Sequence, residues 1–496
     1  MKELPLITRA RSHGERIALR EGERSFSYSE LLETSQSIAA NLLDGRDDLA
    51  ETRVGLMAPA GFDYVAIQWA IWRAGGIVVP LSVHAMPPEL AHSLEDSGTE
   101  LIVTTPDHAA RLTGNGARVL IVDKIAKATT CNLPEIHPQR RAMILYTSGT
   151  TNKPKGVVST HANLNAQIET LVDAWEWRAD DRIPLFLPLH HIHGIVNVLG
   201  CALWSGATVE AFPRFETDVV LRCVANGAYT LFMAVPTIYS KLAALLDSRP
   251  GEHEAVVRGF AKMRLMVSGS AALPAGLHRQ WSALTGQILL ERYGMTETGM
   301  ILSNPLHGER RPGSVGLPLP QVEVRLRTER GEDIAAEGEP GEIQVRGPGV
   351  FGEYWRLPHI TEDSFEDGWF RTGDMAVLEA GYYRILGRLS VDIIKSGGYK
   401  LSALEIEAAL LDHPAIRECA VVGLADDTWG EAVAVAAVLE SGEETLELDE
   451  LRRWGKERLS PYKLPHHILL VETLPRNAMG KVTKREVERL FRPQEG

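Results

Sequence analysis

Cysteine is scarce in this chain, and its four residues are scattered without a Cys-x-x-Cys pair. Zinc ribbons and fingers need such pairs, and small disulfide-held proteins need more cysteines at closer spacing. The cysteine pattern therefore excludes both classes and is typical of a reducing compartment. Residues 1–14 also lack the apolar core of a secretory signal and the Ser/Arg-rich texture of an organelle presequence. We accordingly expect a cytoplasmic protein.

Long hydrophobic runs and an excess of positive charge are lacking as well. No apolar stretch reaches the roughly 18 residues of a membrane-spanning helix, so we expect no membrane span. The chain carries 65 acidic and 52 basic side chains, a formal charge of −13. Nucleic-acid binding requires a basic face, so nucleic acid is not expected as a partner. Small anionic ligands stay open, because they need only local positive potential. Nothing in the sequence indicates the oligomeric state.

Short apolar runs alternate with amphipathic segments along most of the 496 residues. Residues 54–57, 77–81, 101–104 and 288–291 predict strands, and residues 28–43 and 64–74 predict helices. This alternation favours α/β architecture with largely parallel sheets. Between residues 322 and 386 the alternation of apolar and polar residues is typical of half-exposed antiparallel strands. A strand-turn-helix pattern then follows at residues 392–411.

These changes in texture predict two domains. The first, residues 1–388, would combine parallel-sheet α/β subdomains with a small β-barrel-like subdomain. A boundary near residues 389–390 leaves residues 391–496 as a small α+β domain, and about 105 residues is an ordinary domain size.

One segment concentrates groups that bind phosphate. Tyr146-Thr-Ser-Gly-Thr-Thr-Asn-Lys-Pro-Lys-Gly156 follows a predicted strand and is rich in hydroxyl groups, glycine and lysine. Hydroxyls and backbone N–H groups donate to phosphate oxygens, and lysine adds charge without fixed geometry. It is not a Walker loop, because Pro-Lys-Gly stands where Gly-Lys-Ser/Thr would be. By composition alone, a polar surface loop is the alternative.

This segment resembles the signature loop of the acyl-adenylate-forming superfamily, which contains acyl-CoA synthetases, luciferases and nonribosomal adenylation domains. One departure is Asn152, where the family usually has glycine; asparagine tolerates left-handed dihedrals, so the turn can be kept. The resemblance covers nearly the whole chain. Further motifs follow in the family's order: Ser268-Gly-Ser-Ala-Ala272, Tyr293-Gly-Met-Thr-Glu297, Arg371-Thr-Gly-Asp374, Gly387-Arg388 and Pro475-Arg-Asn-Ala-Met-Gly-Lys481.

The resemblance implies that ATP, Mg²⁺ and CoA bind to this chain. Tyr293 would stack on adenine, Thr296 would contact the α-phosphate, and Glu297 would hold Mg²⁺, a hard cation that prefers carboxylate oxygen. Asp374 and Arg388 would contact the ribose. The nucleotide- and CoA-binding residues implied in this way are Thr147, Ser148, Gly149, Thr150, Thr151, Lys155, Ser270, Ala271, Tyr293, Asp374, Arg388, Lys395, Gly397 and Gly398.

Two carboxy-terminal segments would act in different half-reactions of such an enzyme. Lys481 would reach the active site during adenylation, where its charge bridges the carboxylate and the α-phosphate. Residues 394–399 would rotate inward for thioester formation, with Gly397 and Gly398 letting pantetheine pass close to the backbone. The mobile small domain would turn at Ser390, where many relatives carry Asp or Lys. From the local sequence alone, Lys481 would be a solvated turn residue, and only the order of the motifs favours the catalytic role.

The predicted acyl pocket contains charged and polar side chains. Leu189-His-His-Ile-His-Gly194 places three histidines together, and Arg292 immediately precedes Tyr293. A guanidinium pairs bidentately with a carboxylate, so Arg292 suits a second carboxylate on the substrate. These residues, with the run at 291–300, resemble the malonyl/methylmalonyl-CoA synthetase branch. Alternatively, Arg292 pairs with a neighbouring acid and the histidines are satisfied in the core. The candidate substrate residues are Arg292, His193, Ser268, Ile192 and Met300, and the candidate catalytic residues are Lys481, His191, Thr296 and Glu297.

The resemblance therefore implies an ATP-dependent acid–thiol ligase. A carboxylate would attack the α-phosphorus of ATP to give acyl-AMP and pyrophosphate, and CoA would then displace AMP. No nucleophilic side chain is needed, because positioning and charge stabilisation suffice. The expected acid is malonate, with methylmalonate as a second acid. The alternatives are a fatty-acyl- or aryl-CoA ligase of short or medium chain, a carrier-protein-loading adenylation enzyme, and a nucleotide-binding regulatory protein without catalysis.

Overall fold

The computed structural model describes residues 3–114, 116–125, 132–147, 154–248, 251, 253–396, 399–426, 428–443, 445–476 and 482–491. The chain forms two compact units. Unit 1 comprises Met1–Leu273, Leu277–Val324 and Val345–Phe370, and unit 2 comprises Pro274–Gly276, Arg325–Gln344 and Arg371–Gly496. This division assigns residues 371–388 to the smaller unit, so a functional boundary at residues 389–390 stays a prediction. Among the described residues, no helix has both the length and the hydropathy that crossing a bilayer requires.

The largest sheet of unit 1 has the strand order β18-β8-β7-β4-β3-β5-β6. Five of its strands, from β7 to the edge strand β6, are parallel, as the alternating pattern predicts. They are β3 (Arg53–Met57), β4 (Ile77–Pro80), β5 (Leu101–Thr104), β6 (Arg118–Ile121) and β7 (Arg141–Thr147). Two antiparallel strands, β8 (Lys155–Thr160) and β18 (Glu353–Tyr354), complete one edge.

Both faces of this sheet are buried, because neighbouring residues of one strand enter different apolar clusters. Val54 and Leu56 join the main core, whereas Met57 packs with Ile77 and Val79 on the other face. Helix α3 packs against α2 and on strands β3 and β4. The helical segments around this sheet are α1 (Pro5–His13), α2 (Tyr28–Leu43), α3 (Phe62–Arg73), α4 (Pro87–Ser97), α5 (Pro106–Ala109), η1 (Ala110–Leu112), η2 (Val122–Lys124) and α6 (His161–Ala174).

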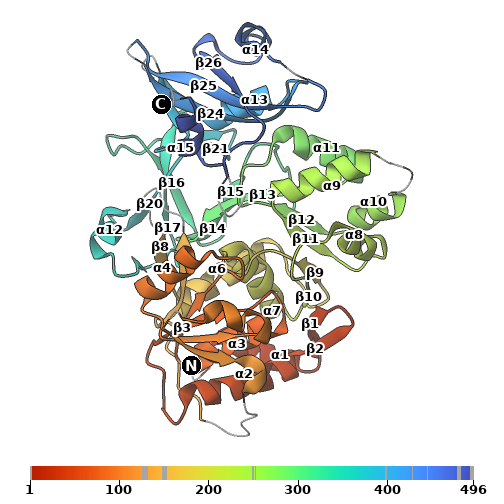
Figure 1. The fold of residues 1–496 in the computed structure, drawn as a ribbon, viewed down its shortest axis with the longest axis vertical. Helices are drawn as coiled ribbons and strands as arrows, with labels where there is room; N and C mark the ends of the chain where they lie inside the picture. Colours follow the sequence, from red (N-terminus) through yellow and green to blue (C-terminus); the bar gives the residue numbers. More distant parts are fainter. Residues whose placement is uncertain are drawn as a thin grey trace. The chain divides into compact units, whose positions relative to one another are not determined.

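Two further sheets complete the α/β part of unit 1 (Figure 1). One has the order β2-β1-β10-β9, from β1 (Ile17–Glu21), β2 (Arg24–Ser27), β9 (Arg182–Leu185) and β10 (Thr208–Ala211). The other runs in the order β11-β12-β13-β14-β15, from β11 (Leu231–Ala234), β12 (Leu265–Ser268), β13 (Leu290–Met295), β14 (Gly299–Ser303) and β15 (Leu317–Pro318). Their helices are η3 (His193–Gly200), α7 (Cys201–Ser205), α8 (Thr217–Ala225), α9 (Pro236–Ser248), α10 (Glu254–Ala261) and α11 (Ala275–Thr285).

The strand predicted at Ile288 begins at Leu290 and continues to Met295. It turns back into β14 as an antiparallel hairpin. The Tyr293 motif therefore lies on the end of a strand and its turn, and not at a helix N-terminus.

The half-exposed antiparallel strands predicted after residue 322 form the sheet β16-β17-β20-β19, with β21 pairing β20. Its elements are β16 (Glu323–Arg327), β17 (Gly341–Arg346), β19 (Phe365–Glu366), β20 (Trp369–Glu379) and β21 (Tyr382–Arg388), with helix α12 (Pro358–Asp363) in the connection before β19. The antiparallel pairing of β20 with β21 sets Asp374 opposite Arg388.

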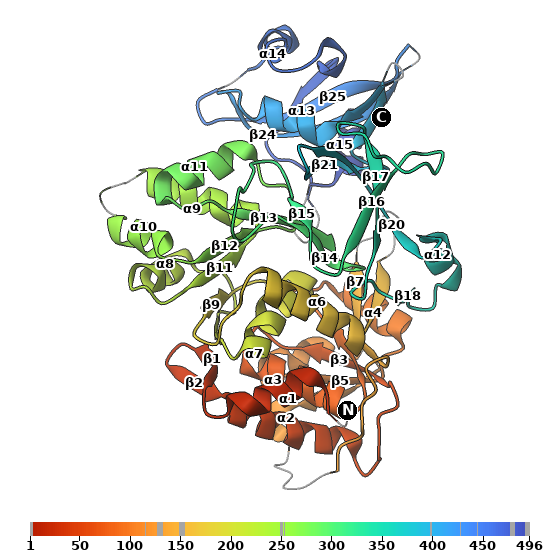
Figure 2. The same ribbon diagram turned by 180° about the vertical axis from the view of Figure 1, so that it is seen from behind.

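The carboxy-terminal part of unit 2 is a small α+β structure (Figure 2). Its sheet has the order β23-β22-β25-β24, with β26 parallel to β25. The strand-turn-helix predicted at residues 392–411 contains an additional strand, because β22 and β23 form a hairpin before α13. Its elements are β22 (Ile393–Ser396), β23 (Tyr399–Ser402), α13 (Ala403–Leu410), β24 (Ile416–Asp426), β25 (Gly430–Leu439), α14 (Leu448–Gly455), η5 (Pro461–Lys463), β26 (His467–Leu470) and α15 (Lys484–Leu490).

Candidate functional site

Arg292 is a buried cation on strand β13. It is only 4% exposed, and its guanidinium lies against the backbone of Gly269, where an added Cβ would come within 2.4 Å of Cζ. Its Nε and Nη2 have no hydrogen-bond partner among the described residues. Burial lowers the pKa of Arg292 to about 9, so it is still charged at neutral pH. A buried charge with unused N–H groups is costly unless an anion joins it.

A histidine near this cation contacts one serine, and a second serine is paired with Glu291 on the neighbouring strand. His193 Nδ1 lies 3.0 Å from Ser270 Oγ, while His193 Nε2 and the Oγ of buried Ser268 have no partner among the described residues. Burial, followed by the positive charge of Arg292, lowers the pKa of His193 well below its ordinary value. The imidazole is therefore neutral at pH 7. Ser270 is held in the left-handed region at φ +70°, a conformation that non-glycine residues rarely adopt.

The β13–β14 hairpin is closely packed at Met300 and Gly294. Met300, on β14, is buried, and Gly294 approaches that strand so closely that an added Cβ would lie 2.8 Å from Met300 Cε. A larger residue at position 294 would push the two strands apart. Ile192 is buried immediately before η3, and the half-buried His191 lies beside His190 with ring centres 4.2 Å apart and the ring planes tilted by 49°.

Glu297 lies in the hairpin turn between β13 and β14 and is buried. Its Oε1 accepts a hydrogen bond of 2.9 Å from the hydroxyl of Tyr354, and its carbonyl oxygen accepts one of 2.7 Å from the N–H of Phe351. Tyr293 and Thr296 are half-buried on the same hairpin. A carboxylate oxygen suits Mg²⁺. Since the described residues contain no cluster of three His, Cys, Asp or Glu, phosphate and water oxygens would supply the remaining ligands.

The ends of the predicted phosphate loop lie beside each other. Thr147 closes β7 and Lys155 opens β8, and the two residues are paired across the antiparallel strands. The Lys155 ammonium lies 4.7 Å from the ring centre of Tyr354. The remaining loop residues, Ser148, Gly149, Thr150, Thr151, Asn152 and Lys153, lie outside the described residues.

Unit 2 contains the predicted ribose and CoA contacts. Arg388 Nε donates to Asp374 Oδ1 at 2.9 Å, so the two predicted ribose residues form an ion pair. Lys395 is exposed on β22 and Ser390 is exposed after β21. Gly397, Gly398 and Lys481 lie outside the described residues. In unit 1, Ala271 is exposed beside Ser270.

Two residues of the site were missed by sequence reasoning. Gly269 makes room for the Arg292 guanidinium, and Tyr354 holds Glu297. A glycine between two serines at the end of a strand is a signal of close approach that could have indicated the first. Tyr354 carries no local signal, because its contact joins residues 57 positions apart.

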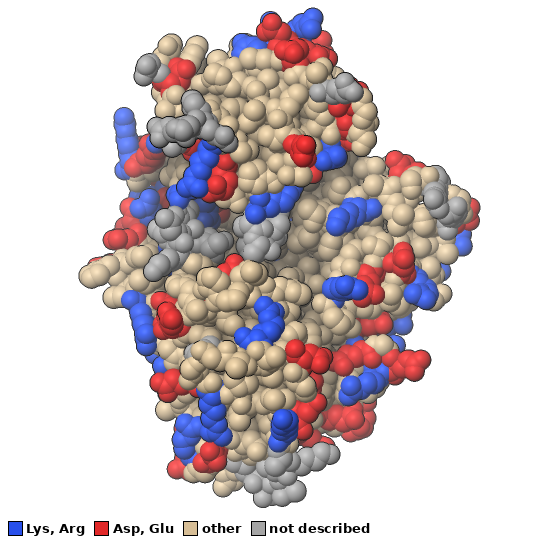
Figure 3. Space-filling model, in the orientation of Figure 1, with Lys and Arg blue, Asp and Glu red and all other residues tan. Residues whose placement is uncertain are grey.

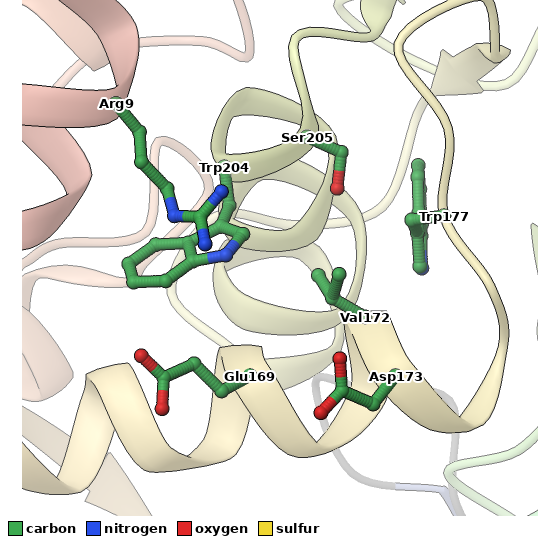
Figure 4. Close-up of a pocket in the computed structure, with 7 residues that line it drawn as sticks. All are labelled: Arg9, Glu169, Val172, Asp173, Trp177, Trp204 and Ser205. Carbon is green, nitrogen blue, oxygen red and sulfur yellow. The ribbon is translucent and has the colours of Figure 1, made fainter.

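An open pocket of about 310 Å³ occurs elsewhere in unit 1 (Figure 4). In it, the Arg9 guanidinium carbon lies 4.4 Å from the ring centre of Trp204. Because Arg9, Glu169 and Asp173 are exposed, this pocket is a hydrated depression, and we assign no ligand to it. None of the predicted site residues lines it; the lining residues are Arg9, Glu169, Val172, Asp173, Trp177, Trp204 and Ser205.

Two family models match this chain, and they belong to the two parts of one enzyme family. The AMP-binding enzyme family model matches residues 6–355, and the AMP-binding enzyme C-terminal domain model matches residues 405–481. The chain is 42% identical to the mitochondrial malonate–CoA ligase ACSF3 of Bos taurus, covering 99% of this chain and 91% of that protein.

Two solved structures are also similar to this chain. One is ATP-bound MatB from Rhodopseudomonas palustris, at 32% identity and a TM-score of 0.88, covering 98% of this chain and 99% of that one. The other is a malonyl-CoA ligase ternary product complex with methylmalonyl-CoA and AMP bound, at 39% identity and a TM-score of 0.70. The alignment covers 96% of this chain and 100% of that one.

Proposed function

Because this chain belongs to the AMP-binding enzyme family, in the malonyl-CoA synthetase branch of the acyl-adenylate-forming superfamily, we propose that it converts malonate to malonyl-CoA. It is an AMP-forming acid–CoA ligase. The observation that carries the choice of acid is the buried guanidinium of Arg292 with two unpartnered nitrogen atoms.

The proposed reaction has two steps. A carboxylate of malonate attacks the α-phosphorus of ATP, so the bond to pyrophosphate breaks and malonyl-AMP forms. The CoA thiol then attacks the acyl carbon, AMP leaves, and the thiol proton passes to solvent. Mg²⁺ bound at Glu297 would neutralise phosphate charge. The residues of the chain bind and orient the reactants, with Arg292 holding the second carboxylate while the first one reacts.

The chemistry around Arg292 favours a dicarboxylic acid over a fatty or aromatic one. His193 is neutral at pH 7, so its Nε2 would add a hydrogen bond to a carboxylate without adding charge. An acid without a second carboxylate would leave the guanidinium unpaired, at a cost of roughly 3–5 kcal/mol. One extra methylene in an apolar pocket changes binding by only about 1–3 kcal/mol. Preference for dicarboxylates should therefore be sharp, and discrimination between malonate and methylmalonate weaker.

A substrate panel tests this proposal, with AMP release and thioester formation measured for malonate, methylmalonate, succinate, octanoate and benzoate. We expect malonate to give the highest kcat/KM. Arg292→Ala should lower kcat/KM for malonate by roughly two to three decades, following the cost of an unpaired buried charge. Its affinity for ATP should change little.

Arg292→Lys is the matched control, since lysine keeps the charge but lacks the bidentate fork, and its activity should fall between the other two. Undiminished malonate activity in Arg292→Ala would refute the assignment of the acid. Equal activity with octanoate or benzoate in the unmodified chain would favour a fatty-acyl- or aryl-CoA ligase. A phosphopantetheinylated carrier protein tested against CoA identifies the acceptor. The cytoplasmic location stays a prediction, and the Bos taurus relative is named as mitochondrial.

A further inference from the structure

We propose that Tyr354 is a positioning residue that couples the carboxylate of Glu297 to the first strand residue after the phosphate loop, Lys155. The inference rests on the proposed function in one respect, namely that Glu297 meets Mg²⁺ and Lys155 meets the phosphates of ATP. It does not depend on which acid is the substrate. Tyr354 does not touch the reacting atoms in this proposal; it acts through the two side chains that it contacts.

Backbone pairing places Tyr354 beside the phosphate loop. Strand β18 pairs antiparallel with β8, which aligns Tyr354 with Val157, and the N–H of Trp355 donates to the carbonyl oxygen of Gly156 at 2.7 Å. The Lys155 ammonium then lies 4.7 Å from the centre of the Tyr354 ring. At this distance a cation is attracted to the negative face of an aromatic ring. The tyrosine ring therefore restrains the direction of the lysine.

The opposite end of the same side chain holds Glu297. The Tyr354 hydroxyl donates to Glu297 Oε1 at 2.9 Å, and both residues are buried. Three residues earlier, the N–H of Phe351 donates to the carbonyl oxygen of Glu297. The ring of Phe351 also packs edge-to-face on Tyr354, with centres 4.7 Å apart. Residues 351–354 therefore fix both the main chain and the carboxylate of Glu297.

One side chain thus contacts the two groups that would handle the triphosphate. Its ring restrains the lysine, and its hydroxyl orients the carboxylate. Outer hydrogen-bond partners of metal ligands typically change metal affinity by about 10- to 100-fold when they are removed. Removing only the hydroxyl should therefore affect Mg²⁺, and removing the ring as well should affect phosphate binding.

Calorimetric titration of the full chain with ATP, without acid or CoA, separates these effects. In Tyr354→Phe, the Mg²⁺ concentration that gives half of the full increase in ATP affinity should rise by about 10-fold or more. ATP affinity in EDTA should stay that of the unmodified chain, because the phenylalanine ring still faces Lys155. In Tyr354→Leu, ATP affinity in EDTA should fall as well.

Tyr28→Phe is the matched control. It also removes a buried tyrosine hydroxyl, one that donates to the Ala207 carbonyl oxygen at 2.7 Å, and its Mg²⁺ response should be that of the unmodified chain. An unchanged Mg²⁺ response in Tyr354→Phe, or an equal loss of ATP affinity with and without Mg²⁺, would overturn the coupling. Tyr354→Phe decides the question even if Tyr354→Leu does not fold.

Glu297→Gln distinguishes the two ways in which the inference could fail. If its Mg²⁺ response is unchanged, the metal role of Glu297 is wrong and the coupling falls with it. If Glu297→Gln weakens the response but Tyr354→Phe does not, only the coupling is wrong. Because the titration contains no acid, an error in the choice of malonate leaves both results unaltered.

Discussion

Glu291 and Arg292 are adjacent in sequence but point to opposite faces of β13, because side chains alternate along a strand. The two residues therefore do not neutralise each other, although both are buried. Glu291 Oε1 accepts a hydrogen bond from the N–H of Leu273 at 3.0 Å, and burial raises the pKa of Glu291 to about 8. The carboxyl group is mostly protonated at pH 7, while the neighbouring guanidinium is charged. Burial thus leaves Glu291 mostly neutral, in a structural hydrogen bond, whereas Arg292 stays charged and can bind an anion.

The raised pKa of Glu291 predicts a specific pH dependence of stability. The unfolded carboxyl group loses its proton near pH 4.5, and the folded one near pH 8. Between these values the folded state binds more protons, so the free energy of unfolding should fall as pH rises, by up to about 1.4 kcal/mol per pH unit. Glu291→Gln keeps an acceptor for Leu273 but lacks this slope. Urea unfolding at pH 5, 6.5 and 8 measures the difference, and parallel curves for the two proteins would contradict the prediction.

At the scale of elements, helix α15 is anchored at its first residue. Lys484 forms a largely buried ion pair with Glu407 on α13, and its Nζ also lies 3.8 Å from Asp392 Oδ1. The same Nζ donates to the carbonyl oxygen of Val421 at 2.7 Å. Just before the helix, Thr483 N–H donates to the carbonyl oxygen of Pro475 at 2.9 Å. These contacts bound the segment that contains Lys481 on both sides.

Breaking this anchor should affect adenylation more than thioester formation. In Glu407→Gln the largely buried Lys484 keeps only Asp392, 3.8 Å away, as a counter-charge, so we expect the start of α15 to loosen and the rate of malonyl-AMP formation to fall at least about 10-fold. Reaction of supplied malonyl-AMP with CoA should change little. Glu486→Gln is the control, because Glu486 is an exposed acid on the same helix. Rapid-quench measurement of the two half-reactions checks this; an equal decrease in both would exclude it.

The elements that sequence predicts well are those with local signals. Helix α2 begins and ends where its pattern predicts, because Ser27 and Glu30 form a capping box and its apolar residues recur on one face. Strand β13 extends four residues beyond its predicted end at Glu291, because polar residues such as Arg292 give no apolar signal. The hairpin β22–β23 was missed because each strand has only four residues.

In the candidate site, the sequence predicts individual residues but not the contacts that position them. Sequence motifs predict Arg292 and Glu297 as site residues, since both belong to one run that resembles the family. The fit of Arg292 against Gly269 and the contact of Tyr354 with Glu297 depend on segments that meet only in the folded chain. A linear pattern holds no information about such an approach, so these positioning contacts needed the structure.

At the scale of the whole molecule, the net charge of the chain has the same sign as the charge of its proposed ligands. The chain has a formal charge of −13, and the face in Figure 3 shows acidic and basic side chains interspersed. The proposed ligands are nevertheless all anionic. Local cations such as Arg292 and Lys155 would meet them, because potential at short range depends on the nearest charges and screening removes distant ones. Net charge therefore excludes a polyanion more readily than a small anion.

The family resemblance predicts that Lys481, which lies outside the described residues, acts in only one of the two half-reactions. Lys481→Ala should abolish the formation of malonyl-AMP, because the bridging positive charge would be lost as negative charge builds on the α-phosphate. Conversion of supplied malonyl-AMP to malonyl-CoA should be largely kept. Pyrophosphate release and thioester formation, assayed separately, check this prediction. Loss of both activities together would show that Lys481 serves the fold or both half-reactions.

The fit of Gly269 against Arg292 has a consequence for redesign of acid specificity. The missing side chain of one residue and the guanidinium of the other occupy the same space, so neither position is independent. A library that varies Arg292 alone would leave an empty volume beside the glycine. A library that varies Gly269 alone would displace the arginine. Variants that accept monocarboxylic acids should therefore be sought by changing both codons together, with a small apolar residue at 269 filling the volume that the guanidinium vacates.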